Sequence, residues 1–199
     1  MRRRIPLILA TYPHPRAAEG LSHGLSDRRF EVRYRCGRGL SHLTQMEPTF
    51  HVSPQVVYGA VLREVEVGAG VWEGRRLLDR LDDEAWSPVV DEAIRERANK
   101  SLEHVFTLLA LVLPRQPLRI AFRGLHVEDP FLRGTAMEYL ESALPPEIRK
   151  PLWPYLEDER PRRGPEPRPT EEALAKLLSQ NDSIVIHLDE LRRKESREG

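Results

Sequence analysis

The chain has 199 residues and a mass of 23.0 kDa, which suits one domain or a short array of helix pairs. Its 31 basic and 31 acidic residues cancel, and apolar residues make up 40% at a mean hydropathy of -0.51, a composition that excludes global disorder. The longest apolar run, residues 105–113, falls far short of the roughly 20 residues of a membrane-spanning helix, and a single cysteine excludes both an internal disulfide framework and a multi-cysteine zinc site.

The first residues predict a short helix and no secretory signal. Arg2, Arg3 and Arg4 precede an apolar stretch that is too short for the core of a signal peptide. Prolines at positions 13 and 15 end the helix predicted for residues 5–11. We therefore expect a cytoplasmic protein that does not insert into a membrane by itself.

Apolar residues at helical spacing continue through the first half of the chain. Ser53-Pro54 and Ser87-Pro88 each predict a helix start, with a capping serine before a proline at the first helical position. The Gly-Ala-Gly sequence at 68–70 is predicted to end a helix. The predicted helices of this half cover residues 15–25, 30–43, 54 to about 67, 71–81 and 88 to about 113, of which the last is the longest and, being apolar nearly all round at its end, central.

The second half is punctuated by proline. Two helices are predicted at 117–125 and 130–144, and Pro151 and Pro154 leave only a short, bent helical piece near Leu156. The domain organisation that follows is a helical repeat domain at 1–157, a linker rich in proline and charge at 158–169 and a C-terminal helical segment at 170–199. Within that segment we expect helices at 171–178 and 182–193, although Ser183 to Ile186 also fits a strand.

Two segments of the chain share one pattern. An acidic turn leads to a branched apolar residue and then arginine, followed three residues later by a small residue and four further on by leucine. The apolar, small and leucine positions share one helix face, and the small residue permits close approach of a neighbouring helix. The arginine can reach the aspartate of the turn or a helix C-terminus in the adjacent pair. The repeat-defining residues are Asp27, Val32, Arg33, Cys36 and Leu40 in the first copy, and Asp129, Leu132, Arg133, Ala136 and Leu140 in the second.

This pattern resembles the HEAT repeat, an α-solenoid unit in which helix pairs stack because no pair buries its apolar face alone. The resemblance implies an all-α fold of stacked antiparallel helix pairs. Because the helix predicted from Pro88 is too long for a standard pair, we expect an irregular array with one long central helix.

A narrower resemblance involves residues 101–115, 117–125 and 132–140. These segments look like the soluble C-terminal HEAT-type region of some bacterial ATP/ADP-translocase-like proteins. That resemblance implies a cytoplasmic appendage of a nucleotide transporter-like membrane protein.

Motifs for catalysis, cofactors or metals are weak. The Gly-x-Gly sequences at 37–39 and 68–70 do not continue as a nucleotide fingerprint, and the seven histidines lack zinc-ligand spacing. We expect Cys36 to be a buried apolar thiol, His104 to lie at the edge of an apolar stripe and the tryptophans to pack in the core or between helices. The sequence thus predicts no enzyme, cofactor or metal ion.

The sequence favours a non-enzymatic scaffold that binds a protein partner, with Arg35, Arg38, Glu138 and Glu141 as candidate contacts. Nucleic-acid binding is the alternative, because residues 1–45 hold nine arginines and three acidic residues, a local charge of +6. The same arginines are also explained as stems that cover apolar helix faces. As an enzyme, the fold would act on DNA like HEAT-type glycosylases, and the candidate residues are Arg35, Arg38, Trp72 and Asp79.

Overall fold

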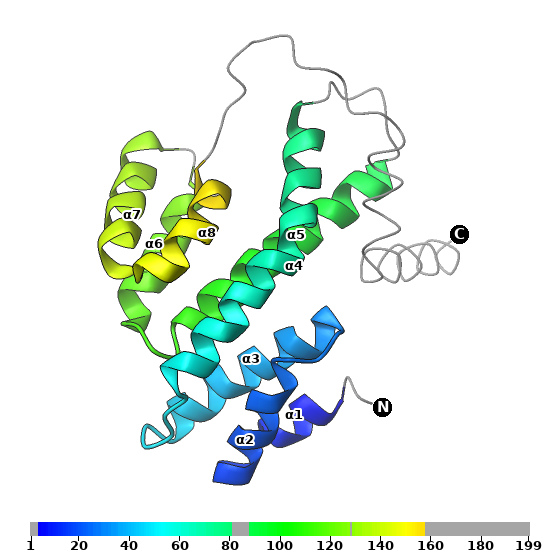
Figure 1. Cartoon of the computed structure of the whole chain (residues 1–199), viewed down its shortest axis with the longest axis vertical. Coiled ribbons are helices and arrows are strands. Elements are labelled where there is room, and N and C mark those ends of the chain that lie inside the picture. Colours follow the sequence, from blue (N-terminus) through cyan, green and yellow to red (C-terminus); the bar gives the residue numbers. More distant parts are fainter. Residues whose placement is uncertain (1–3, 81–87, 128, 158–199) are drawn as a thin grey trace. The chain divides into compact units, whose positions relative to one another are not determined.

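The computed structural model describes residues 4–80, 88–127 and 129–157, and within these ranges the side chains of 74–80 and 88–91 lie outside the description. Every regular element in these ranges is an α-helix, which confirms the predicted all-α fold class (Figure 1). The helices are α1 (Ile5–Leu9), α2 (Pro15–Gly24), α3 (Phe30–Met46), α4 (Pro54–Arg80), α5 (Pro88–Leu109), α6 (Arg115–Leu125), α7 (Pro130–Ala143) and α8 (Pro146–Leu156).

Proline sets most of the helix starts in the described ranges. Helices α2, α4, α5, α7 and α8 each begin at a proline, whose fixed φ and missing N–H suit the first helical position. Two of these starts also have a side-chain cap. The His14 ring accepts a hydrogen bond from the N–H of Arg16, and Asp129 Oδ1 accepts one from the N–H of Phe131.

Helix α4 corrects the prediction of a break at residues 68–70. It continues through Gly68 and Gly70 to Arg80, and its 27 residues exceed the 22 of α5, so the helix from Pro88 is not the longest. No described glycine has a positive φ, so none of the described helices ends in the left-handed glycine conformation that closes many helices. Each glycine in a helix interior costs about 1 kcal/mol of helix stability. Burial of Gly68 and Val71 offsets this cost, and the helix continues.

Helix α8 differs from the prediction made for the second half of the chain. Residues 146–156 form one helix that contains Pro151 and Pro154, where we expected a short bent piece. Its residues Ile148, Leu152 and Leu156 recur at intervals of four and are buried, and this packing offsets the lost backbone hydrogen bonds. Helix α5 also ends at Leu109, four residues before the predicted end at 113.

The chain divides into two compact units. Unit 1 consists of Met1–Glu66 and Ser101–Glu157, and unit 2 of Val67–Lys100 and Asp158–Gly199. In unit 2, Trp72 is buried as predicted, and its indole N–H donates to the carbonyl of Ala98 at 3.2 Å, which ties α4 to α5. The predicted linker at 158–169 and the predicted segment at 170–199 lie outside the described residues.

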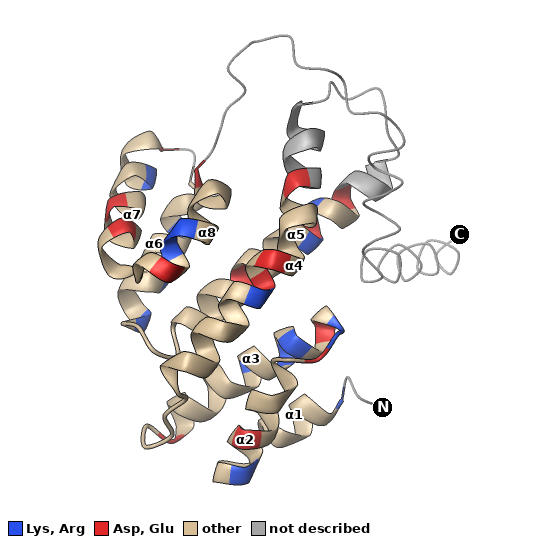
Figure 2. Cartoon of the chain, viewed as in Figure 1, with Lys and Arg blue, Asp and Glu red and all other residues tan. Residues whose placement is uncertain are grey.

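Unit 1 contains two helix hairpins, α2–α3 and α6–α7. Each is antiparallel with a short turn, and Figure 1 shows them on opposite sides of the parts of α4 and α5 that belong to this unit. Their apolar stripes supply much of the core, including Leu21, Leu40, Leu118 and Leu140. Acidic and basic residues occur along most of the helices (Figure 2). None of the described helices combines the length and apolarity that a membrane crossing requires.

Candidate functional site

Within each hairpin, the two helices meet at the same kind of close contact. A Cβ added to Gly24 would lie 2.2 Å from Cys36 Sγ, and a Cβ added to Gly124 would lie 2.9 Å from the Cβ of Ala136. Each glycine therefore lies directly on the small residue of the facing helix. The glycine, arginine, small-residue and leucine counterparts are 100 positions apart in the chain, as in Gly24 and Gly124 or Leu40 and Leu140, whereas Asp27 and Asp129 are 102 apart.

Aspartates cap the turns of both hairpins. Asp27 Oδ1 accepts a hydrogen bond from the N–H of Arg29 at 2.8 Å, one residue before α3. Asp129 Oδ1 accepts hydrogen bonds from the N–H of Phe131 at 2.8 Å and from the N–H of Leu132 at 3.4 Å. Both carboxylates are thereby engaged by backbone N–H groups at the start of the second helix of their hairpin.

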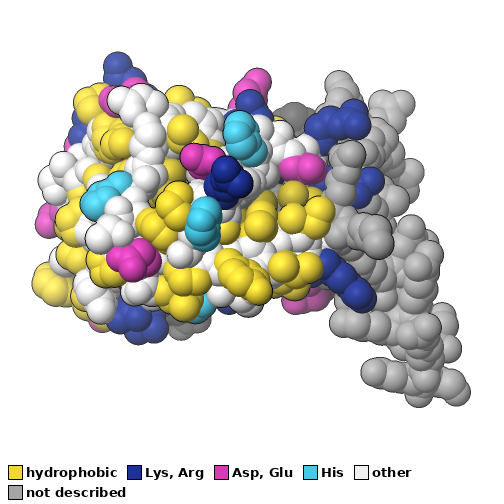
Figure 3. Space-filling view, turned by 90° about the horizontal axis from the view of Figure 1, so that it is seen from below, with side chains coloured by type: hydrophobic (Ala, Val, Ile, Leu, Met, Phe, Trp, Pro, Cys, Tyr) yellow, Lys and Arg dark blue, Asp and Glu magenta, His cyan; other side chains and the backbone are white. Residues whose placement is uncertain are grey.

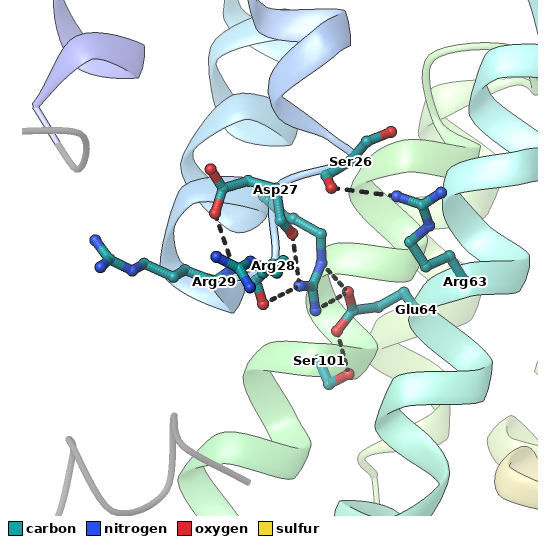
Figure 4. A network of polar contacts seen from close by, with 8 residues as sticks. Ser26, Asp27, Arg28, Arg29, Arg63, Glu64 and Ser101 are labelled. Atoms are coloured by element: carbon teal, nitrogen blue, oxygen red, sulfur yellow. Dashed lines mark hydrogen bonds and ion pairs between the residues drawn. The ribbon is translucent and has the colours of Figure 1, made fainter.

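Arg33 forms the centre of a buried polar network (Figure 4). Its Nε donates to Glu64 Oε2 at 2.8 Å, Nη2 forms an ion pair with the same oxygen at 2.8 Å, and Nη1 donates to the carbonyls of Asp27 and Arg28. The second carboxylate oxygen of Glu64 accepts a hydrogen bond from Ser101 Oγ at 3.0 Å. The network connects the turn before α3 with α3, α4 and α5, and Arg63 adds a bond from α4 to the carbonyl of Ser26 at 3.2 Å.

The Arg33–Glu64 ion pair holds α3 and α4 together. The side chains are 4% and 1% exposed, and Ser101 is fully buried. All three nitrogens of the guanidinium and both oxygens of the carboxylate are engaged within the protein. A substrate would have to break these contacts to reach either charge, so the geometry favours a structural brace over a catalytic pair.

Arg133 occupies the corresponding position in the second hairpin. Its Nη1 donates to the carbonyl of Leu125 at the end of α6, and its Nη2 donates to the carbonyl of Leu156 at the end of α8, at 2.7 Å. Carbonyls at helix C-termini lack intrahelical partners and carry partial negative charge, which the guanidinium satisfies. The sequence predicted contact with the turn's aspartate or with a helix C-terminus of the adjacent pair. Arg33 instead bonds backbone carbonyls of the turn, and Arg133 reaches the C-terminus of α6 in its own hairpin and that of α8.

Aromatic side chains surround a histidine beside the Arg33 network. His104 is 1% exposed, and its ring lies 6.0 Å from the ring centroids of both Phe30 and Tyr34. The expectation of a boundary position for His104 is wrong, because α3 covers the face of α5 on which it lies. Tyr34 donates from its hydroxyl to Glu103 Oε2 at 2.8 Å, and burial, followed by this contact, raises the pKa of Tyr34.

Cys36 is a buried apolar thiol, as predicted. Burial, with a smaller contribution from the negative charge of Asp27, raises the pKa of its thiol to about 12. A thiol with this pKa is protonated at neutral pH and is a poor nucleophile. Its position inside α3, against Gly24, assigns it a packing role.

The predicted contact residues lie on two separate helices. Arg38 is exposed on α3, with its guanidinium 5.8 Å from the ring centroid of Tyr34, whereas Arg35 is half-buried. Glu138 and Glu141 are exposed on α7. The arginine pair thus lies on the second helix of one hairpin, and the glutamate pair lies on the second helix of the other.

Several exposed apolar side chains escaped sequence reasoning. Val32 is buried, but its counterpart Leu132 is 48% exposed, so the prediction that it lies on the buried face is wrong. Leu132 stands in the first turn of α7, where no described helix covers it. Phe131 beside it is 79% exposed, and α1 exposes Ile5, Leu7 and Ile8. Figure 3, which views the side of the molecule where α1 and α2 lie, shows such apolar side chains between charged ones.

The described residues contain no group of three or more His, Cys, Asp or Glu side chains placed to hold a metal ion. No protein-family model matches the chain, and neither a characterised protein nor a solved structure shows significant similarity to it.

Proposed function

We propose that the chain is a non-enzymatic helical module of the HEAT type that binds a protein partner. The observation that carries the proposal is the repeated hairpin. Two helix pairs, 100 positions apart, share a glycine packed on a small residue, an aspartate cap and an arginine brace. Stacked helix pairs of this kind present an extended surface for macromolecules.

The partner surface proposed here is carried by the exposed charges of the second helices. Arg38 on α3 and the pair Glu138 and Glu141 on α7 extend from rigid helices into solvent. Such side chains add specificity and association rate at the rim of an interface. Attachment to a transporter-like membrane protein, which the narrower resemblance implies, is one setting for such a module.

Affinity capture with two charge-reversal variants tests the proposal. Wild-type protein, R38E and E138K would be immobilised and exposed to lysate of the source cells, and captured proteins would be identified by mass spectrometry. We expect at least one protein that wild type retains and one of the variants loses. R119E on the exposed side of α6 is the matched control. Identical captured sets for all four proteins would contradict the assignment of this surface.

Nucleic-acid binding is the alternative, and the structure narrows its candidate residues. Arg28, Arg29 and Arg38 are exposed, whereas Arg33 is committed to Glu64. Trp72 is buried with its N–H engaged, which argues against its use as a base-stacking side chain, and the side chain of Asp79 lies outside the described residues. Gel shifts with duplex and single-stranded DNA at low salt test the alternative, and salt-sensitive binding that R28E/R29E abolishes would favour it.

A further inference from the structure

Helix α1 is apolar on the side that faces away from the protein as well as on the side that packs against it. Its inner side consists of buried Pro6 and half-buried Leu9 and Ala10. Leu9 lies against Gly20 of α2 and Ala10 against Gly39 of α3, at 3.2 and 3.3 Å from a Cβ built on each glycine. A helix anchored in this way would ordinarily turn polar side chains to water.

Large apolar side chains instead occupy the outer side of α1 and the turn that follows it. We name this surface the α1 face and define it as Ile5, Leu7 and Ile8 of α1 and Tyr12 just beyond the helix, which are 51%, 55%, 62% and 67% exposed. The hydroxyl of Thr11, beside them, donates to the carbonyl of Ile8 at 2.8 Å. In Figure 2 the ribbon of α1 has no charged residue along its length. The face is therefore an exposed apolar surface formed by one short helix and the turn after it.

The sequence on either side of α1 is basic. Residues 1–18 contain Arg2, Arg3, Arg4 and Arg16 and no aspartate or glutamate. Arg4 immediately precedes α1, Arg16 is in the first turn of α2, and both are exposed. Apolar side chains flanked in the sequence by Arg4 and Arg16 are complementary to a surface that offers both hydrocarbon and negative charge.

We propose that the α1 face adsorbs reversibly onto an anionic lipid bilayer, with its apolar side chains at the level of the headgroups and the arginines on lipid phosphates or carboxylates. Interfacial segments of proteins combine these two contributions, buried apolar area and attraction to anionic lipid. This is contact with one leaflet surface, and it does not depend on the proposed protein-binding function.

The size of the α1 face favours a bilayer over a protein. Four side chains on a five-residue helix and the turn after it offer far less than the roughly 800 Å² per partner of a stable protein interface. A bilayer requires no matching shape and accepts a small convex protrusion. Nucleic acid would use the arginines but would leave the isoleucines and Leu7 exposed to water.

Vesicle flotation of the full chain tests the proposal. We expect the protein to float with phosphatidylcholine vesicles that contain about 30% phosphatidylserine, and to stay behind with pure phosphatidylcholine. Raising the salt concentration from about 0.05 to about 0.5 M should release most of it, because the arginine contacts are screened.

Paired variants test whether vesicle binding depends on the α1 face or on any exposed apolar side chain. I5S/I8S should bind the anionic vesicles about tenfold more weakly, because two exposed apolar side chains are removed. I120S on α6 is the matched control, since Ile120 is 67% exposed, and it should bind like wild type. Circular dichroism should show the same helix content for all three proteins.

A fluorescent label reports the depth of contact. L7C can be labelled selectively with an environment-sensitive maleimide, because the native Cys36 is buried. Its emission should shift to the blue on anionic vesicles, and the emission of labelled I120C should not. The proposal fails if wild type does not float, if I120S loses as much binding as I5S/I8S, or if polyglutamate or DNA binds through the same isoleucines more tightly than the vesicles do.

Discussion

The hairpins α2–α3 and α6–α7 have one local design and two different surroundings. In the first, Arg33 is buried and shares Glu64 with Ser101, and Val32 is covered. In the second, Arg133 is half-buried and bonds only carbonyls among the contacts described, and Leu132 is exposed. The same sequence pattern thus sets the contacts inside a hairpin, while the neighbouring helices decide what each side chain contributes to stability.

The largest difference between the hairpins should come from the Arg33 brace. Glu64→Ala leaves a buried guanidinium without its carboxylate and should lower the free energy of unfolding by about 3–5 kcal/mol. Urea unfolding followed by circular dichroism measures the change. Glu66→Ala on the exposed side of α4 is the matched control and should change stability by less than about 0.5 kcal/mol.

Two further variants sharpen this comparison. Arg33→Met/Glu64→Leu removes both charges and should recover much of the stability lost in Glu64→Ala, since a buried ion pair is replaceable by apolar side chains. Arg133→Ala, which loses hydrogen bonds to two carbonyls, should cost about 1–3 kcal/mol. Equal losses for Glu64→Ala and Glu66→Ala would show that the buried network does not support the fold.

The paired positions Val32 and Leu132 provide the next test. Val32→Ala opens a cavity in the core and should cost about 2 kcal/mol, whereas Leu132→Ala removes a half-exposed side chain and should cost less than about 0.5 kcal/mol. Thermal unfolding of both variants measures the difference. A larger loss for Leu132→Ala would indicate that a partner or a second copy of the chain covers this position in solution.

Local chemistry explains why the hairpin contacts could be predicted from sequence. Proline marks the helix starts, and the spacing of the small residue and leucine identifies the buried face of α3. Glu64 could not be predicted as the partner of Arg33, because it lies 31 residues away on another helix. The same holds for buried His104 and exposed Leu132, whose environments depend on which helix covers them.

Helices α4 and α8 both continue through residues that predict an interruption. By intrinsic propensity, Gly68 and Gly70 in α4 and Pro151 and Pro154 in α8 favour a break. In both helices the buried side chains recur at helical spacing across the interruption, and burial contributes more than the local cost. The α1 face escaped sequence reasoning for the opposite reason, since its apolar residues resemble core residues until the neighbouring helices are in place.

The glycine contacts test whether the two hairpins tolerate the same change. Gly124→Ala brings a Cβ against the Cβ of Ala136 and the carbonyl oxygen of Leu132, so the helices must separate, and we expect a loss of about 2–3 kcal/mol. Gly24→Ala meets mainly the thiol of Cys36 and should be rescued in part by Cys36→Ala. Gly134→Ala, in open space on α7, should raise the stability by about 0.5–1 kcal/mol in the same unfolding measurement. Equal effects at all three glycines would contradict the close packing.

A dependence on pH also separates the hairpins, because a thiol occurs only in the first. The pKa of Cys36 is raised from 9.0 to about 12 in the folded protein, so the native state holds this proton more tightly than the unfolded chain does. Its contribution to stability is complete below pH 9 and is lost as the pH rises toward 12. Unfolding free energies measured between these values should fall more steeply for wild type than for Cys36→Ala, by up to about 1.4 kcal/mol per pH unit. Tyr34 and the other titrating groups act alike in both proteins, so parallel slopes would mean that the thiol is not shielded by the contact with Gly24.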